Sequence, residues 1–205
     1  MKTEYMHLEK KLNYLSRLFC YNAKKPLFLV LLNCFLFFCN CNATGQGNDL
    51  KLVFIRHAER PVHGDNLNCQ GLNRSLQLPA LLNKKFGLPT NVYIPSLGMG
   101  KVTKRSRMLQ TISPFVIKYG LTVNSDFEET DYKGLGDALL RENGLILIVW
   151  EHKNIAPVLA YLGVQDRLKW PDDDFDSIWI VTFHKGKVIF TAGKEQLHPA
   201  IGCPF

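Results

Sequence analysis

Four ionisable side chains follow directly after an apolar run near the middle of the first third of the chain. Residues 52–55 are β-branched or bulky and apolar, which is typical of a buried strand. Arg56, His57, Glu59 and Arg60 come immediately after them. Ligands of open α/β sheets bind where strands end at their carboxyl side. The pattern therefore predicts a polar site that faces a cleft, the alternative being a solvated turn after a core strand.

A second strand with the same kind of ending lies ninety residues further on. Residues 145–150 read LILIVW, and Glu151 and His152 follow them. If the strands at 51–56 and 145–150 are parallel neighbours, His57 and His152 meet at one edge of the sheet.

Arginines around a histidine suit phosphoryl chemistry. Guanidinium groups match the geometry of phosphate oxygens and stay charged at physiological pH. A neutral imidazole nitrogen is a competent nucleophile, and we expect nearby cations to favour the neutral form of His57. The arginines also stabilise charge in the transition state, so we expect neither a metal nor another cofactor. The sequence contains no CxxC pair and no cluster with zinc-ligand spacing.

The elements that must position these residues alternate between strands and helices. Asn68 and Asn154 are expected to be N-caps, and Pro79 and Pro114 are expected to kink or split their helices. Acidic loops are expected at 121–133 and 170–176. The other predicted elements are helices at 69–86, 105–119, 134–142 and 154–162, a strand at 91–94, and a hairpin of strands 177–183 and 187–192. This order predicts a three-layer α/β/α sandwich with a mixed, mostly parallel sheet.

Several of these segments resemble the histidine phosphatase superfamily, which has the phosphoglycerate mutase-like fold. RHAER at 56–60 resembles the RHG signature of that superfamily, and residues 67–75 resemble its L-[ST]-x-x-G helix entry. Residues 106–111, SRMLQT, are similar to the SxxxRAxxT helix, and WEH at 150–152 stands where the family has its second histidine. The four segments occur in the family's order between residue 51 and about residue 183. Ala58 and Glu151 replace glycines that are usual in the family, and its S-P-L segment before the pocket arginine is absent.

The resemblance implies a small, exported phosphomonoester hydrolase that works through a phosphohistidine on His57. Arg56, Arg107 and His152 would bind the phosphoryl group, and Arg60 matches the second arginine of the RHGxR form. The substrate would be a phosphorylated small molecule or a phosphoprotein. The alternatives are a catalytically silent member that binds phosphate or another anion, and a mutase-type phosphotransferase.

Two assignments within the site have competitors. Arg105 competes with Arg107 for the pocket role, and the spacing from Arg107 to Thr111 favours Arg107. The leaving oxygen needs a proton, which a carboxylic acid with a raised pKa can supply. Glu129 lines up best with the family's acid. The other candidates are Glu128, Asp131 and Glu151.

The first 43 residues differ from the rest of the 205-residue chain. They hold six Lys/Arg against two Asp/Glu, which leaves 19 against 16 for the remainder, a balance too weak to indicate a nucleic-acid binder. Lys24 and Lys25 precede a short apolar run that ends in small residues, as in a secretory signal peptide. We therefore predict a signal peptide or N-terminal membrane anchor at 1–43, a catalytic domain at 44–205, and a periplasmic or secreted location. Membrane contact follows only if the leader is not cleaved.

The cysteines follow the same division. Four lie in the predicted leader, so Cys69 and Cys203 are left for the catalytic domain. Two cysteines in an oxidising compartment can pair, but their distance is not encoded in the sequence. Both a disulfide and two free thiols are compatible with the sequence.

Overall fold

The computed structural model describes residues 50–98, 100 and 103–205. The predicted leader at 1–43 lies outside these residues. All described residues belong to one compact unit that spans residues 46–205. Within them, no helix combines the length and the apolar character that crossing a membrane requires.

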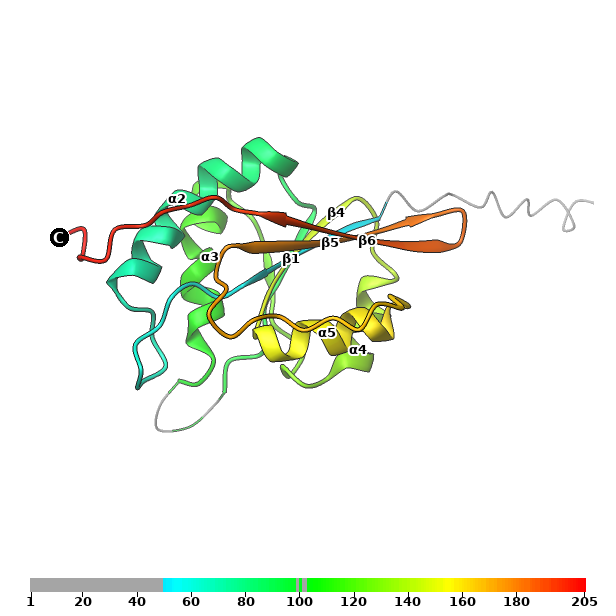
Figure 1. Cartoon of the computed structure of the whole chain (residues 1–205), viewed down its shortest axis with the longest axis horizontal. Coiled ribbons are helices and arrows are strands. Elements are labelled where there is room, and N and C mark those ends of the chain that lie inside the picture. Colours follow the sequence, from blue (N-terminus) through cyan, green and yellow to red (C-terminus); the bar gives the residue numbers. More distant parts are fainter. Residues whose placement is uncertain (1–49, 99, 101–102) are drawn as a thin grey trace, which may run out of the picture. The chain divides into compact units, whose positions relative to one another are not determined.

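The described residues form a six-stranded mixed sheet (Figure 1). Its strand order is β3-β2-β4-β1-β5-β6. Strands β1 to β4 pair in parallel, and β5 and β6 are antiparallel additions next to β1. The strands are β1 (Lys51–Arg56), β2 (Asn91–Tyr93), β3 (Val123–Asn124), β4 (Leu145–Trp150), β5 (Ser177–His184) and β6 (Lys187–Lys194).

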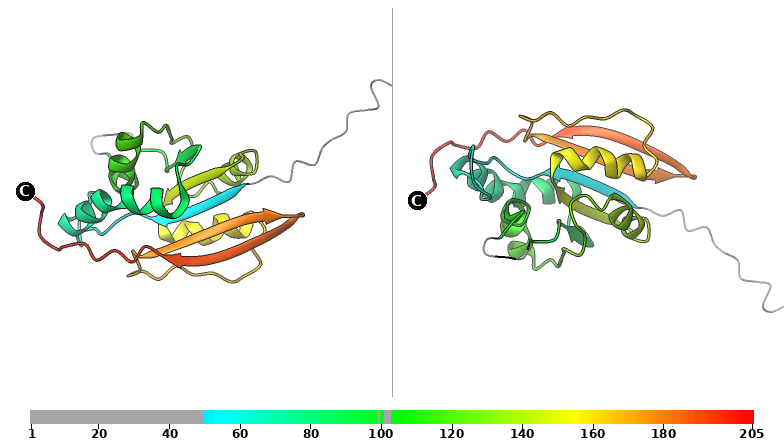
Figure 2. Two further views of the ribbon diagram at one scale, coloured as in Figure 1. Left: turned by 90° about the horizontal axis from the view of Figure 1, so that it is seen from above. Right: turned by 90° about the horizontal axis from the view of Figure 1, so that it is seen from below.

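Two pairs of helices cover the two faces of this sheet (Figures 1 and 2). Helices α2 (Cys69–Phe86) and α3 (Ser106–Tyr119) pack on one face, and α4 (Tyr132–Leu139) and α5 (His152–Tyr161) pack on the other. Strand β1 serves both layers because its side chains alternate. Val53 and Ile55 join the core under α2 and α3, whereas Leu52 and Phe54 join the core under α4 and α5. The predicted three-layer α/β/α fold with a mostly parallel mixed sheet is thus confirmed.

Three local expectations were wrong, and of the fourth, that the interior prolines kink or split their helices, only the split is contradicted. The acidic segment 121–133 contains the short strand β3, which pairs with β2. Helix α4 starts earlier than predicted, because the side chain of Asp131 caps it by accepting from the Gly134 N–H at 2.8 Å. Helix α5 starts at His152, so Asn154 is not its N-cap and instead accepts from the Tyr132 hydroxyl at 3.2 Å. The interior prolines do not split their helices.

One predicted helix cap is confirmed. Asn68 caps α2 by accepting from the Gly71 N–H at 2.8 Å. The tryptophans Trp150, Trp170 and Trp179 are buried in the core. His63, His184 and His198 are exposed.

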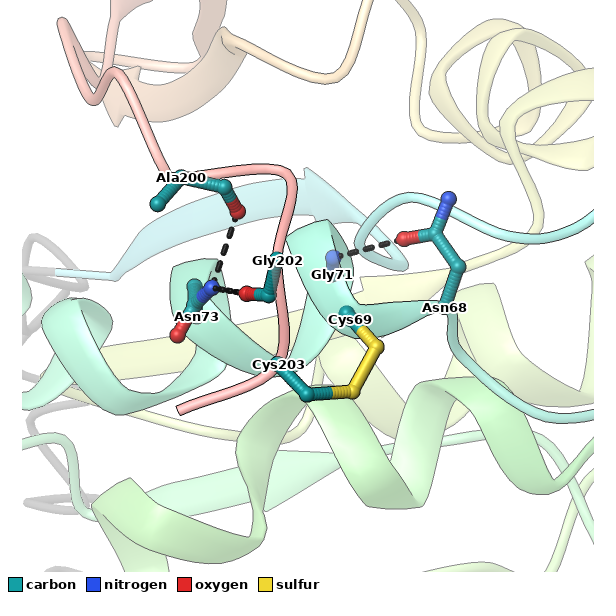
Figure 3. Close-up of a disulfide and its surroundings, with 7 residues drawn as sticks. All are labelled: Asn68, Cys69, Gly71, Asn73, Ala200, Gly202 and Cys203. Carbon is teal, nitrogen blue, oxygen red and sulfur yellow. Dashed lines mark hydrogen bonds between the residues drawn. A yellow bond between two sulfur atoms is a disulfide. The ribbon is translucent and has the colours of Figure 1, made fainter. Parts of the chain in front are cut away.

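A disulfide joins Cys69 at the start of α2 to Cys203 near the end of the chain (Figure 3). The bond closes a loop of 134 residues. Beside it, the side-chain amide of Asn73 donates to the carbonyls of Ala200 and Gly202 at 2.8 and 2.6 Å. The pairing that the sequence left open is therefore present, and it fastens the segment after β6 onto α2.

The sheet register explains why the polar segments converge. In the parallel pair of β1 and β4, Arg56 stands opposite Trp150, so the next residues of both strands leave the sheet side by side. Because β5 runs antiparallel to β1, it begins at the edge where β1 ends. The loop that precedes β5 therefore reaches the same edge, which the order of elements along the chain does not reveal.

Candidate active site

His57 and His152 meet at the carboxyl edge of the sheet. Their ring centroids are 6.5 Å apart, and the rings stand nearly perpendicular. Both residues are buried. The convergence expected from two strand-end histidines is thus confirmed.

The backbone fixes which nitrogen of His57 faces the site. Nδ1 lies 2.7 Å from the Ala58 carbonyl oxygen, which only accepts hydrogen bonds, so we assign the ring hydrogen to Nδ1. In the neutral ring this leaves a lone pair on Nε2. Nε2 is buried and has no hydrogen-bond partner among the described residues. Its nearest acidic neighbour is Oε2 of Glu151 at 3.4 Å.

Glu151 lies between the two histidines. Its Oε1 contacts Nδ1 of His152, while its Oε2 faces His57. Burial alone would raise the pKa of Glu151, but its contacts with His152 and His57 outweigh burial and lower that pKa well below its ordinary value. Glu151 is therefore a carboxylate at neutral pH.

The loop before β5 orients both His152 and Arg56. His152 Nε2 lies 2.8 Å from Oδ1 of Asp172, and this hydrogen bond lowers the pKa of Asp172. Arg56 donates through Nη1 to the Asp172 carbonyl at 2.7 Å and stacks 3.9 Å above the Phe175 ring. Asp174 holds the end of this loop, because its carboxylate accepts from the Ser177 N–H and hydroxyl.

Helix α3 is fastened to the end of β1 by a buried threonine. The Ala58 N–H donates to Oγ1 of Thr111 at 2.8 Å, and that hydroxyl donates to the Arg107 carbonyl at 2.7 Å. Thr111 is fully buried. This chain of two hydrogen bonds fixes the first turn of α3, and with it Arg107, against the segment that carries His57.

The two competing arginines have different surroundings. Arg105 is occupied, because its Nε donates to the Ser96 carbonyl at 2.7 Å and its Nη1 lies 2.5 Å from Oε2 of Glu128. Among the residues that the structure describes, the ionic neighbour of Arg107 is Oδ1 of Asp65, at 3.9 Å from Nη2. Its buried Nε finds no partner among the described residues. The guanidinium of Arg107 is thus available to a ligand, and that of Arg105 is not.

The four candidates for the general acid also differ in their contacts. Asp131 caps α4, Glu128 pairs with Arg105 and is mostly exposed, and Glu151 is held ionised by the histidines. For Glu129, burial first and then the charge of Glu151 raise the pKa of its carboxyl group. The indole N–H of Trp150 donates to the Glu129 carbonyl at 3.0 Å and holds this residue near the site.

A pocket of about 670 Å³ opens at this edge of the sheet. Five cationic residues line it, against three acidic ones. The lining residues are Arg60, Gly64, Asp65, Lys104, Arg105, Arg107, Glu129, Glu151, His152 and Lys153. Arg60 stands at the exposed rim, where its guanidinium donates to the neighbouring Pro61 carbonyl at 3.4 Å. His57 and Arg56 are not among the lining residues and lie buried beneath them.

Glu59 faces away from this pocket, into a buried ion cluster. Nε and Nη2 of Arg74 donate to the Glu59 carboxylate at 2.8 to 3.0 Å, and Nη1 donates to Oε2 of Glu195 at 2.5 Å. Burial raises the pKa of Glu195 to about 7, although Arg74 opposes the shift. Gly71 permits this packing, since a Cβ there would lie 2.2 Å from the Glu59 carbonyl oxygen. Glu59 therefore has a structural role in the ion pair with Arg74. Glycine is required at position 71 because a larger side chain would clash with the Glu59 backbone.

Sequence reasoning missed Asp172 and Phe175 as part of the site. The run of aspartates at 172–174 was interpreted as a solvated acidic turn. Asp172 is indeed exposed, yet it holds His152. The only signal in the sequence was that this run directly precedes a strand predicted to belong to the same sheet.

Comparisons with known proteins give structural matches only. No protein-family model and no curated protein matches the chain, whereas 34 chains of solved structures do. One is the protein histidine phosphatase SixA complexed with tungstate, at 16% identity and a TM-score of 0.49, covering 71% of this chain and 97% of that one. Another is the alpha-ribazole phosphatase from Shigella flexneri, at 12% identity and a TM-score of 0.45, covering 69% and 94%. The activities named here are those of the matched proteins.

Proposed function

We propose that the protein is a metal-independent histidine phosphatase that hydrolyses phosphomonoesters through a phosphohistidine on His57. The observation that carries the proposal is the fixed orientation of His57, whose Nδ1 is bound to the Ala58 carbonyl while Nε2 is left without a hydrogen-bond partner in the described part of the chain. A buried imidazole with a free lone pair, next to a pocket lined mainly by cations, is suited to attack a phosphoryl group. The superfamily resemblance of the sequence points to the same chemistry.

In the first step the Nε2 lone pair of His57 attacks phosphorus and the ester P–O bond breaks. Arg107, Arg56 and a His152 that carries a proton on Nδ1 bind the phosphoryl oxygens and stabilise the charge that develops on them, and Arg60 binds at the rim. Glu129 gives its proton to the leaving oxygen, for which its raised pKa is suited. Water then attacks phosphorus, the P–N bond breaks, and Glu129 takes the proton from that water. Phosphate leaves and His57 is regenerated.

The pocket suggests a class of substrate, and the disulfide suggests a cellular location. The pocket is open and has cations at its rim, so we propose a phosphorylated small molecule or a phosphorylated protein segment as substrate.

We also propose that the protein is exported to the periplasm or the medium. The Cys69–Cys203 disulfide supports this location, because such bonds persist in oxidising compartments.

The test is an aryl phosphate assay on wild type, on His57→Ala and on the matched control His184→Ala, which removes an exposed histidine from the β5–β6 turn. We expect His57→Ala to lose at least about 10³-fold in kcat, as removal of a covalent nucleophile does, and His184→Ala to keep the wild-type rate. Labelled substrate should leave an acid-labile phosphoryl group on wild type only. Equal turnover by wild type and His57→Ala would remove the nucleophile from the mechanism.

One observation favours a second candidate, a silent member that binds anions without turnover. The Glu151 carboxylate lies 3.4 Å from Nε2 of His57, where it would repel an incoming phosphoryl group. This candidate predicts that labelled phosphate or a phosphoester binds with no release of product. Multiple turnovers by wild type would exclude it.

A further inference from the structure

Two imidazole lone pairs and one carboxylate point at the same small volume. For His57 the free atom is Nε2, because Nδ1 donates to the Ala58 carbonyl. For the neutral ring of His152 the free atom is Nδ1, because Nε2 lies 2.8 Å from Oδ1 of Asp172 and donates to it. Both free nitrogens are buried and make no hydrogen bond within the described residues. The Glu151 carboxylate faces both of them.

This arrangement requires a positive charge at its centre. Two nitrogen lone pairs and a carboxylate repel each other, and buried polar atoms without partners destabilise the folded state. Either protons on the histidines or a metal ion can supply the charge. One donor atom from each of His57, Glu151 and His152 lies within 4.8 Å of the other two, a spacing from which a single ion can be bound with small side-chain movements.

The neighbours of the three groups match the surroundings of bound metals. A histidine that binds a metal usually donates its other N–H to a carboxylate or a backbone carbonyl, which fixes the ring and raises its basicity. His57 has the Ala58 carbonyl in this place, at 2.7 Å, and His152 has Asp172, at 2.8 Å. Two histidines and one glutamate form a ligand set that Zn²⁺ uses, with a fourth position left open. Glu151 and His152 line the pocket, from which a fourth ligand could approach.

The charges around the three groups set the expected affinity. Arg56 is buried and directly precedes His57, so its positive charge weakens metal binding. The carboxylate groups of Glu151 and Asp172, which contact the two histidines, offset that charge. A divalent transition metal that favours imidazole nitrogen is therefore expected, whereas Mg²⁺ and Ca²⁺, which favour oxygen ligands, are not.

We propose that Nε2 of His57, the Glu151 carboxylate and Nδ1 of His152 form a binding site for Zn²⁺ or a similar transition metal. The proposal rests on this geometry and goes beyond the phosphatase function. Because the metal uses the lone pair with which His57 would attack phosphorus, metal binding and phosphorylation of His57 exclude each other. The metal is thus an inhibitor of the proposed reaction and not its cofactor.

The test measures Zn²⁺ binding directly, in the full chain after EDTA treatment and alkylation of free thiols, by competition with a chromophoric chelator. We expect wild type to bind one more equivalent of Zn²⁺ than Glu151→Ala does, and Co²⁺ to give a tetrahedral visible spectrum with wild type only. Glu151→Gln keeps the shape of the side chain and should lose the same equivalent. Asp172→Asn should bind about 10- to 100-fold more weakly.

The matched control is Asp173→Asn, which removes the neighbouring carboxylate of the same loop and should bind as wild type. Equal Zn²⁺ stoichiometry and affinity in wild type, Glu151→Ala and Glu151→Gln would overturn the proposal, since protons would then supply the charge. Failure of the two proposals is distinguishable. If His57 is labelled by substrate but Zn²⁺ does not bind, the phosphatase proposal stands and the metal site is rejected. If Zn²⁺ binds but His57 is not labelled, the metal site stands and the phosphatase proposal is rejected.

Discussion

The sharpest test of the site compares two arginines two positions apart. Arg107 lines the pocket, its Nε has no partner in the described residues, and its nearest carboxylate oxygen is 3.9 Å away. Removing one donor that stabilises transition-state charge costs about 10²- to 10³-fold in kcat, or about 2.7 to 4 kcal/mol. We therefore expect Arg107→Ala to lose that much, and Arg107→Lys to recover part of it, because lysine restores the charge without the planar fork.

Arg105→Ala is the matched control. Its guanidinium pairs with Glu128, which is 59% exposed, and such exposed pairs contribute about 0.2 to 1 kcal/mol. Even if that whole amount were lost from the transition state, the rate would fall less than about sixfold. The Arg105→Ala substitution removes the same charge from the same pocket as Arg107→Ala does. The comparison therefore distinguishes direct binding of the phosphoryl group from the overall positive potential of the pocket.

The assay is steady-state hydrolysis of an aryl phosphate, with kcat and KM determined separately for the three variants. Thermal unfolding of each variant checks that the fold is kept. A loss in Arg105→Ala that equals or exceeds the loss in Arg107→Ala would refute the reasoning. It would mean that the contacts to Ser96 and Glu128 break on substrate binding and that the alignment of α3 with the family's helix is wrong.

Three further predictions concern stability and pH. Reducing the Cys69–Cys203 bond should lower the free energy of unfolding by about 2 to 5 kcal/mol, because the closed loop is long. Denaturant unfolding of Cys203→Ser should match that of reduced wild type. An unfolding curve equal to that of oxidised wild type would contradict this prediction. The pKa of Glu195 is raised on folding to about 7, so its stabilising contribution is complete below the unfolded value near 4.5 and is lost as the pH rises through 7, by up to about 3 kcal/mol. Glu195→Gln should remove this component from urea unfolding measured across that range, and an unchanged pH profile would show that Arg74 keeps the carboxylate ionised. Glu129→Gln should lower kcat about 10²-fold or more and remove the fall in rate at high pH, since the wild-type acid must be protonated to act; a pH–rate profile with an unaltered alkaline limb would transfer the acid role to another group.

Much of the fold followed from local pattern. The strands at 51–56 and 145–150 were predictable because apolar runs of that length, with polar residues after them, occur at the core of α/β sheets. The ends of the α4 and α5 helices were not, because they depend on which of several polar residues caps the helix. Asp131 and Asn154 both favour a cap by their chemistry, and only the first acts as one.

The sequence by itself determined that two histidines and several arginines stand at strand and helix ends, because side-chain type and period are local properties. Only the tertiary structure decided which nitrogen of each histidine is free, that Glu151 lies between them, and that Arg107 is available while Arg105 is not. These facts depend on contacts between segments that are far apart in the chain, above all on the loop before β5. An antiparallel strand brings that loop to the site, and strand direction is set by the whole sheet and not by any one segment.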